Sequence, residues 1–255
     1  MNRLLAIASN TFRETIRDKI LYSIIFFACI VILGSVAMEE VTIGDQDKVV
    51  RSMAQGAIRL FGSVIALFLG VGLVYKELER KTIYTIASKP IPRWIFVLGK
   101  YTGLLWVLAL ELALMALLYT VLMWSRQGAP HSSVYISWVM LYMELGLLTA
   151  WALLFSCYSA PTTAALFSIS IWTIGHLADD IWHFGQEASS ITIQKTSEVI
   201  YWILPNFEMF NASAAAVHEL PLTLSHFGGV ALYGIGYTAV VLTLAVIVFG
   251  NRDFK

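Results

Sequence analysis

The chain has 255 residues, of which 58% are hydrophobic and only 13% are charged, and its formal net charge at pH 7 is zero. Soluble domains carry about 25% charged residues, so this composition excludes an ordinary water-soluble protein and indicates that lipid surrounds most of the surface. The balanced charge supplies no basic field, and we expect no nucleic-acid partner. Cys29 and Cys157 both fall in apolar runs, which excludes a disulfide framework.

The N-terminal segment 1–19 is polar but carries apolar residues at helical spacing, namely Leu5, Ala8, Phe12 and Ile16. Charged residues occupy its other faces. We therefore expect an interfacial helix that lies along the inner membrane surface before the chain enters its first span. A merely solvated helical leader is the alternative, because the apolar stripe is narrow.

Six apolar segments follow, and a helix needs about 20 apolar residues to cross a bilayer. They are approximately 20–38, 57–75, 95–123, 135–157, 162–178 and 229–249. The fifth is short, and the third is long enough to tilt. The sequence thus predicts an all-α integral membrane protein with six transmembrane helices, organised as one transmembrane domain over residues 1–255.

The lysines and arginines predict the orientation of these spans. With both termini in the cytoplasm, twelve cations fall in cytoplasmic segments and five fall outside. The five outside are Lys48, Arg51, Arg59, Arg126 and Lys195. This bias favours cytoplasmic termini.

The loop between the second and third spans, residues 76–93, is a charged island between two apolar runs. Residues 76–88 contain no Gly or Pro, so they can form a short helix in which Glu77 and Lys81 pair at i,i+4. Two prolines then stop that helix. A rigid charged helix between two spans can be pushed by a soluble partner and will move both spans. The alternative is an ordinary cytoplasmic loop.

Two carboxylates lie inside the predicted spans, Glu111 in the third and Glu144 in the fourth. Ionisable groups inside a membrane are costly, which makes them candidates for functional sites. They could face each other, share a proton or line a polar path. Because we expect no Lys or Arg at the same depth, the favoured interpretation is structural, with each carboxyl protonated and hydrogen-bonded to a neighbouring helix.

Residues 179–228, between the fifth and sixth spans, form a long aromatic external segment in which we expect two or three short helices. His176, Asp180 and His183 share one face if the fifth helix continues. That spacing can hold zinc or copper. Polar residues at a helix mouth are usually only solvated, however, and we assign no metal site.

Small residues recur at intervals of four, as Gly62, Ala66 and Gly70 in the second span and as Gly99 and Gly103 in the third. Such stripes let helices approach closely. They are equally compatible with a homodimer seam and with packing inside one subunit.

Several stretches resemble one family. The sequences E-R-K-T-I at 79–83, S-K-P-I-P-R at 88–93 and L-G-K-Y-T-G at 98–103 look like the inner-loop signature of type 2 ABC-transporter permeases. The start of the chain at 8–22 and its ending at 204–254 resemble the same family. The resemblance is closest to the branch that contains the permeases of nitrous-oxide-reductase maturation.

This resemblance implies the membrane subunit of an ATP-driven exporter, acting as a homodimer among membrane lipids with a separate cytoplasmic ATP-binding subunit, in a bacterial inner membrane. The loop 76–93 would be the coupling helix. The residues that would contact the ATPase are Glu77, Glu79, Arg80, Lys81, Thr82, Arg13 and Arg17. In the matched ending, the candidate gate residues are Phe207, Glu208 and Phe210.

The phosphate-binding pattern G-x-x-x-x-G-K-[ST] does not occur in the sequence. We therefore expect no enzymatic activity and no cofactor in this chain, with ATP and Mg bound by the partner ATPase. Three alternatives stay open. One is a self-contained ion-coupled transporter or channel that uses Glu111 and Glu144; another is a subunit that transmits ATPase motion to external partners without transport. The third is an intramembrane metalloenzyme. No motif specifies the transported substrate.

Overall fold

The computed structural model describes residues 3–36, 46–79 and 92–251. Over these residues the regular structure is helical throughout, with no strand. In chain order the elements are α1 (Arg3–Ile16), α2 (Lys19–Gly34), α3 (Gln46–Glu79), α5 (Arg93–Gln127), α6 (Ser132–Ser156), α7 (Pro161–His176), α8 (Ala178–Glu187), α9 (Ile191–Ile203), the 3-10 helix η1 (Glu208–Phe210), α10 (Ser213–Val217) and α11 (Leu224–Gly250).

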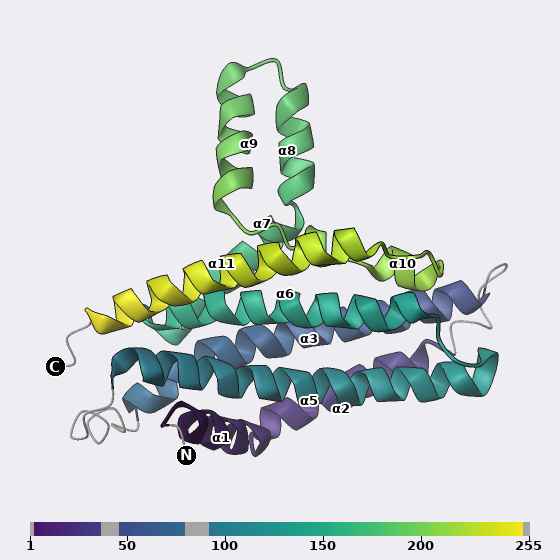
Figure 1. Ribbon diagram of the computed structural model, residues 1–255, viewed down its shortest axis with the longest axis horizontal. Coiled ribbons are helices and arrows are strands. Elements are labelled where there is room, and N and C mark those ends of the chain that lie inside the picture. The colour runs from purple at the N-terminus through teal and green to yellow at the C-terminus, as the bar shows by residue number, and fades with distance from the viewer. Residues whose placement is uncertain (1–2, 37–45, 80–91, 252–255) are drawn as a thin grey trace.

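Four of these helices are long and apolar enough to cross a membrane: α3, α5, α6 and α11. They run side by side and form the body of the molecule (Figure 1). The centre is α6, which contacts α3, α5, α7 and α11 because it is apolar on all sides. These findings confirm an all-α, multi-pass membrane protein.

The predicted first and fifth spans are the short helices α2 and α7, of 16 residues each. At 1.5 Å per residue each is about 24 Å long, whereas the hydrocarbon core measures about 30 Å. The number of complete crossings therefore stays a prediction for these two helices.

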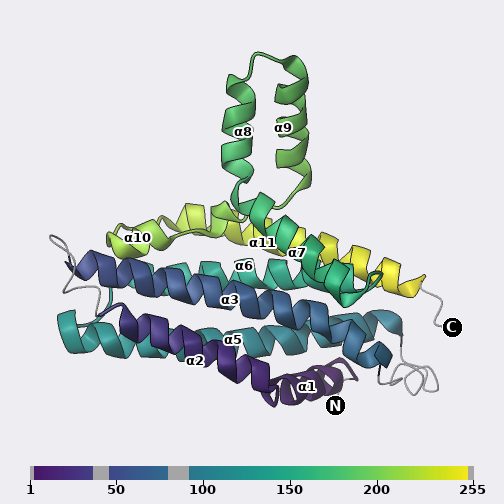
Figure 2. The same cartoon turned by 180° about the vertical axis from the view of Figure 1, so that it is seen from behind.

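The fifth predicted span, α7, does not continue through the bundle. Helix α7 begins at Pro161, a residue suited to a first helical turn, and ends at His176 beside the middle of α6. The chain then leaves the bundle as the α8–α9 hairpin, which stands out across the direction of the long helices (Figures 1 and 2). After the hairpin, α10 returns to the same two neighbours that α7 contacts, α3 and α6. Thus α7 and α10 occupy the two halves of one groove.

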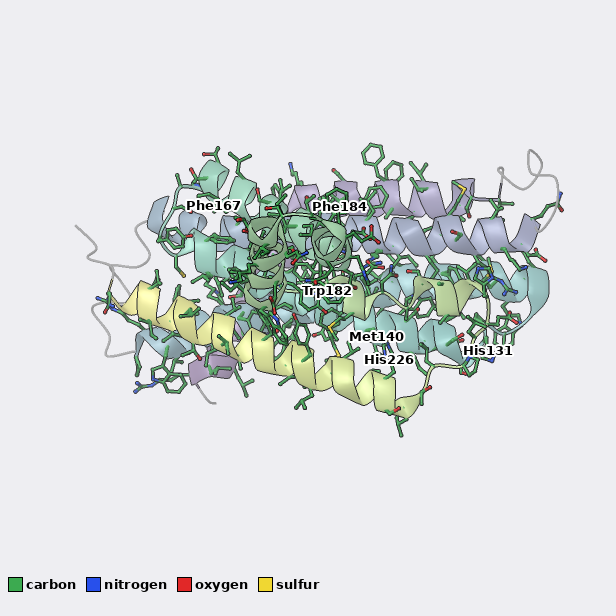
Figure 3. All side chains as sticks on the ribbon, turned by 90° about the horizontal axis from the view of Figure 1, so that it is seen from above. His131, Met140, Phe167, Trp182, Phe184 and His226 are labelled. Atoms are coloured by element: carbon green, nitrogen blue, oxygen red, sulfur yellow. The ribbon has the colours of Figure 1, made fainter. Side chains whose placement is uncertain are left out.

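A glycine allows α8 and α9 to approach closely. A Cβ atom at Gly185 would stand 1.8 Å from Ser197 Oγ. The two helices line an open apolar pocket of about 550 Å³, to which Ile181 and Ile200 contribute. Figure 3, which looks down on the hairpin, shows Trp182 and Phe184 over the middle of the long helices.

The small-residue stripes pack within one subunit. A Cβ at Gly62 would lie 3.1 Å from Leu145, and one at Gly70 would lie 2.5 Å from Ala152, so this stripe lets α3 approach α6. The other pair, Gly99 and Gly103, faces α1. Close packing inside the subunit accounts for both stripes.

The predicted N-terminal helix is present as α1, and it lies on α5. A Cβ at Gly103 would stand 2.6 Å from the Ala8 carbonyl oxygen, and the Phe12 ring meets Trp106 edge-on at 6.2 Å. Within the apolar stripe, Ala8 is fully buried but Leu5 is 44% exposed. The buried face of α1 is therefore centred nearer to Ala8 and Phe12 than the sequence pattern indicates.

Candidate functional site

An ion pair joins two long helices inside the bundle. Arg59 lies within α3 (Gln46–Glu79), fourteen residues into the helix, and Glu144 is the central residue of α6. Arg59 Nη2 lies 3.2 Å from Glu144 Oε2, and the Glu144 side chain is fully buried. The expectation that Glu144 has no cationic partner at its depth is therefore wrong. The expectation fails because α3 begins at Gln46, so Arg59 lies inside the helix and not at its outer end.

His176 brings the end of α7 to this pair. Its Nε2 atom lies 3.2 Å from Glu144 Oε1 and 3.0 Å from Arg59 Nη2. Its Nδ1 atom lies 2.8 Å from the carbonyl oxygen of Trp172, one turn earlier in α7. The last residue of the short helix is thereby tied to α3 and α6 together.

Glu208 completes the arrangement from the other side of the break. Its Oε2 atom lies 3.7 Å from Arg59 Nη2, and its Oε1 atom accepts a hydrogen bond of 2.5 Å from Asn211 Nδ2. We call Arg59, Glu144, His176 and Glu208 the charge cluster. The exposed fraction of the side chain rises from 0% at Glu144 to 16% at Arg59, 20% at His176 and 40% at Glu208. A buried charge requires such partners, since an unpaired one is strongly destabilising.

The two candidate gate aromatics fill sockets made by glycines. Phe207 is fully buried, stacks on the His176 ring at 5.5 Å and occupies the space that a Cβ at Gly175 would need. Phe210 is 1% exposed and fills the equivalent space at Gly234 of α11. We call the region where α7 ends and η1 begins, with these aromatics and the charge cluster, the joint.

Asn206 fastens the joint further. Its backbone N–H donates to Tyr233 Oη of α11 at 2.9 Å, and its Nδ2 donates to Asp179 Oδ1 of α8 at 2.7 Å. Backbone pairing also crosses the break, because Phe207 N–H donates to the carbonyl oxygen of Gly175 at 2.9 Å. Both ends of the inserted hairpin are thus held to each other and to α11.

Glu111, the second carboxylate that the sequence singles out, lies apart from this network. It is 2% exposed near the middle of α5, and neither of its oxygens has a hydrogen-bond partner among the described residues. It therefore shares no hydrogen bond with Glu144. The sequence signal missed Arg59, which a search for cations inside a longer second span would have found.

The three residues considered for a metal have different contacts. His176 belongs to the charge cluster, Asp180 lines the hairpin pocket, and the His183 ring meets Trp182 at 4.8 Å. Over the described part of the chain, no group of three His, Cys, Asp or Glu residues is arranged to hold a metal ion.

A family comparison decides the class of protein. The model of the ABC-2 family transporter proteins matches residues 5–254, nearly the whole chain. The chain belongs to the ABC-2 transporter family. It is a permease component of an ABC transporter, as the resemblance in its loops predicts, while the nitrous-oxide-reductase branch stays a prediction. No curated protein sequence matches it.

In this ABC-2 permease, the structure describes four of the seven residues that are predicted to contact the ATPase. Arg13 and Arg17 are exposed at the end of α1. Glu77 and Glu79 belong to the last turn of α3. The other three, Arg80, Lys81 and Thr82, lie outside the described residues.

Arg93, the last residue of the loop 76–93, is anchored in the permease. Arg93, the first residue of α5, donates from Nη1 to the carbonyl oxygens of Phe249 at 3.2 Å and Gly250 at 2.6 Å. A cation suits these groups, because the last carbonyls of a helix lack partners within it. The chain leaving the loop is therefore joined to the end of α11 as well as to α5.

Proposed function

We propose that this permease serves an ATP-driven exporter in which a separate cytoplasmic subunit binds ATP and Mg and hydrolyses the nucleotide. The observation that carries the proposal is the set of contacts that begins at the coupling loop. Arg93 links the start of α5 to the end of α11, and Gly99 and Gly103 hold α1 against α5. A push on the loop 76–93 or on α1 would reach both helices.

The polar contacts between α1 and α5 support the same transmission of motion. Lys100 of α5 is 4% exposed, and its Nζ atom lies 4.0 Å from Glu14 Oε2 of α1. At Gly103 the two helices lie so close that an added Cβ would stand 2.6 Å from the Ala8 carbonyl oxygen. We infer that α1 and α5 move as one body, with exposed Arg13 and Arg17 available to the ATPase together with the coupling residues of the loop.

The movable part would be the joint. A continuous helix between α3 and α6 would resist bending, whereas a crossing broken at His176 can open by separating α7 from η1. Phe207, Glu208 and Phe210 would then act as the gate, with the two aromatics leaving their glycine sockets. Closure of the ATPase subunits would open this gate, and the cargo would cross beside it.

We expect both termini in the cytoplasm of a bacterial cell, with the protein in the inner membrane. Figure 1 supports a common side for the termini, because the N and C labels lie toward the same end of the long helices. We also expect two copies in the complex. Strongly exposed apolar residues such as Leu232 (76%) and Leu117 (62%) would face lipid or the second copy.

One alternative has an observation of its own. A self-contained ion-coupled transporter would need ionisable groups inside the membrane, and Glu144 contacts Arg59 and His176 there. Glu111→Gln separates the two functions: it would abolish transport in the ion-coupled protein and would be tolerated in the ATP-driven permease. A subunit that transmits ATPase motion without transport would use the same coupling contacts.

The deciding experiment is a pull-down of tagged protein from gently solubilised membranes. An ATP-binding subunit should co-purify with the wild type, and Glu79→Ala/Arg80→Ala should weaken that association several-fold. The matched control is Lys195→Ala/Glu198→Ala on the exposed face of α9, which removes the same two charges far from the loop and should leave the association intact. Folded protein that purifies alone would contradict the proposal.

A further inference from the structure

A small polar cavity lies where the chain returning from the hairpin packs on α3 and α6. It is lined by Gln55 and Arg59 of α3, by Ser137, Leu141 and Glu144 of α6, and by residues 210–213, which join η1 to α10. Most of these residues have polar side chains. The cavity has a volume of about 10 Å³, which holds about one water molecule. It is too small for any larger solute.

Gln55 aims a hydrogen-bond donor into this cavity. The side chain is 4% exposed, and the indole N–H of Trp138 lies 3.2 Å from its Oε1 atom. An indole N–H can only donate, so the amide atom that faces it is the oxygen. The amide nitrogen Nε2 therefore lies on the other side, where it has no hydrogen-bond partner within the described residues. A buried donor without an acceptor is destabilising, so Nε2 needs an acceptor in the cavity.

Arg59 and Glu144 add one more donor and an acceptor to the same cavity. The Nε atom of Arg59 is buried and has no hydrogen-bond partner in the described part of the chain, although Nη2 of the same side chain contacts Glu144. Glu144 has the opposite need. Its oxygens lie 3.2 Å from Arg59 and from His176, yet neither receives an aligned hydrogen bond from a described residue. Two donors and one acceptor thus border a space of one water molecule.

We propose that this cavity is a water-binding site, in which one water molecule accepts hydrogen bonds from Gln55 Nε2 and Arg59 Nε and donates one to Glu144. A buried water typically makes about three hydrogen bonds, and these three groups supply them. A carboxyl group accepts such a bond in either of its charge states, so the site does not depend on the charge of Glu144. This inference rests on the geometry of the cavity and stands whether or not an ATPase binds the chain.

Helix α10 covers the water site. It packs on α3 and α6, and the residues that lead into it line the cavity. Its C-terminal end is fastened to α3, because Arg51 forms an ion pair with Glu219 and its Nη1 atom lies 3.5 Å from the Val217 carbonyl oxygen. Glu219 has a φ of 56°, a left-handed conformation that is uncommon for a residue with a side chain. Exchange of the water would require α10 to lift, which breaks this ion pair.

Radiolytic hydroxyl-radical labelling of the purified full-length protein, read by mass spectrometry, tests the site. A bound water that is activated by X-rays oxidises the side chain beside it. Phe210 and Phe207 are a matched pair, because they are 1% and 0% exposed but only Phe210 of the two lines the cavity. Phe210 should be labelled several-fold more than Phe207. Equal labelling of the two rings would overturn the proposal.

A variant of Gln55 tests the proposed donor. Gln55→Leu removes it and should lower the labelling of Phe210 several-fold. Ser63→Ala is the matched control: Ser63 lies two turns along α3, is buried, and has a hydroxyl without a hydrogen-bond partner among the described residues, but it does not line the cavity. Labelling should be unchanged in this control. Undiminished labelling of Phe210 in folded Gln55→Leu would contradict the site.

Rapid mixing into H₂¹⁸O before irradiation tests the cover, because the ¹⁸O content of oxidised Phe210 reports how fast the bound water exchanges. Glu219→Gln removes the ion pair with Arg51, so ¹⁸O should enter the Phe210 product several-fold faster than in the wild type. Glu198→Gln on the exposed face of α9 removes a carboxylate far from α10 and should leave the rate unchanged. Equal rates in Glu219→Gln and the wild type would overturn the role of α10 as the cover.

Discussion

Two glutamates occupy the middle of two neighbouring membrane helices, and their surroundings differ completely. Glu144 forms close ionic contacts with Arg59 and His176, and Arg59 also contacts Glu208, whereas Glu111 of α5 has neither an ion pair nor a hydrogen bond within the described residues. Equal sequence signals therefore correspond to a polar joint in one place and a solitary buried carboxyl in the other. The role of an intramembrane charge therefore depends on which side chains the other helices place at its depth.

The largest loss of stability is expected when the cation beside Glu144 is removed. Arg59→Met removes the cation and leaves two carboxyl groups without it, one of them fully buried. Breaking a buried pair from one side costs about 3–5 kcal/mol, so thermal unfolding in detergent should occur at a much lower temperature. Arg59→Met/Glu144→Gln should recover part of that loss. An unchanged unfolding temperature in the single variant would mean that the pair contributes nothing to stability.

An intermediate effect is expected at the glycine socket of the joint. Gly175→Ala introduces a methyl group 2.4 Å from the Phe207 ring and 2.6 Å from the Pro205 carbonyl oxygen. Overpacking of this kind costs about 1–3 kcal/mol, measured as a loss of thermal stability. Gly236→Ala in α11 is the matched control, since nothing lies within 4 Å of its Cβ position. Equal stability of the two variants would show that the joint tolerates displacement of Phe207.

The smallest effect is expected at the solitary carboxyl. Glu111→Gln replaces a buried group that has no charged partner with a neutral group of nearly the same shape. The free energy of unfolding should therefore change by about 1 kcal/mol or less. The unfolding temperatures of Glu111→Gln and Arg59→Met, measured under the same conditions, give the direct comparison. A loss as large as that of the arginine variant would place Glu111 in a network of its own and remove the contrast between the two glutamates.

The sequence anticipated much of the helical framework. Long apolar runs place the helices near their observed positions, and the pattern of Leu5, Ala8, Phe12 and Ile16 identifies α1, although Leu5 is largely exposed. Loop motifs at 79–103 indicate the family that the match over residues 5–254 then establishes. These features are local, because hydropathy, helical period and short motifs are all read along a single stretch of chain.

The joint could not be predicted in the same way. Arg59 was expected outside the membrane because polar residues precede it in α3. The fifth apolar run, 162–178, matches α7 within two residues, but it does not show that the end of α7 meets Arg59 and Glu144. The sockets at Gly175 and Gly234 receive aromatics that lie more than twenty residues away in the chain. Packing that joins distant segments has no periodic signature.

The apolar runs of the sequence are enough to predict a helical membrane protein, because burial in lipid demands long apolar helices and leaves few places for charge, and its loop motifs indicate the family. Which charges meet depends on the fold. Arg59, Glu144, His176 and Glu208 come from four elements, and they converge because α7 ends beside the centre of α6 and η1 returns to the same level. The physical reason is that a charge inside a membrane must find its partner across the fold, on whichever neighbouring helix reaches the same depth.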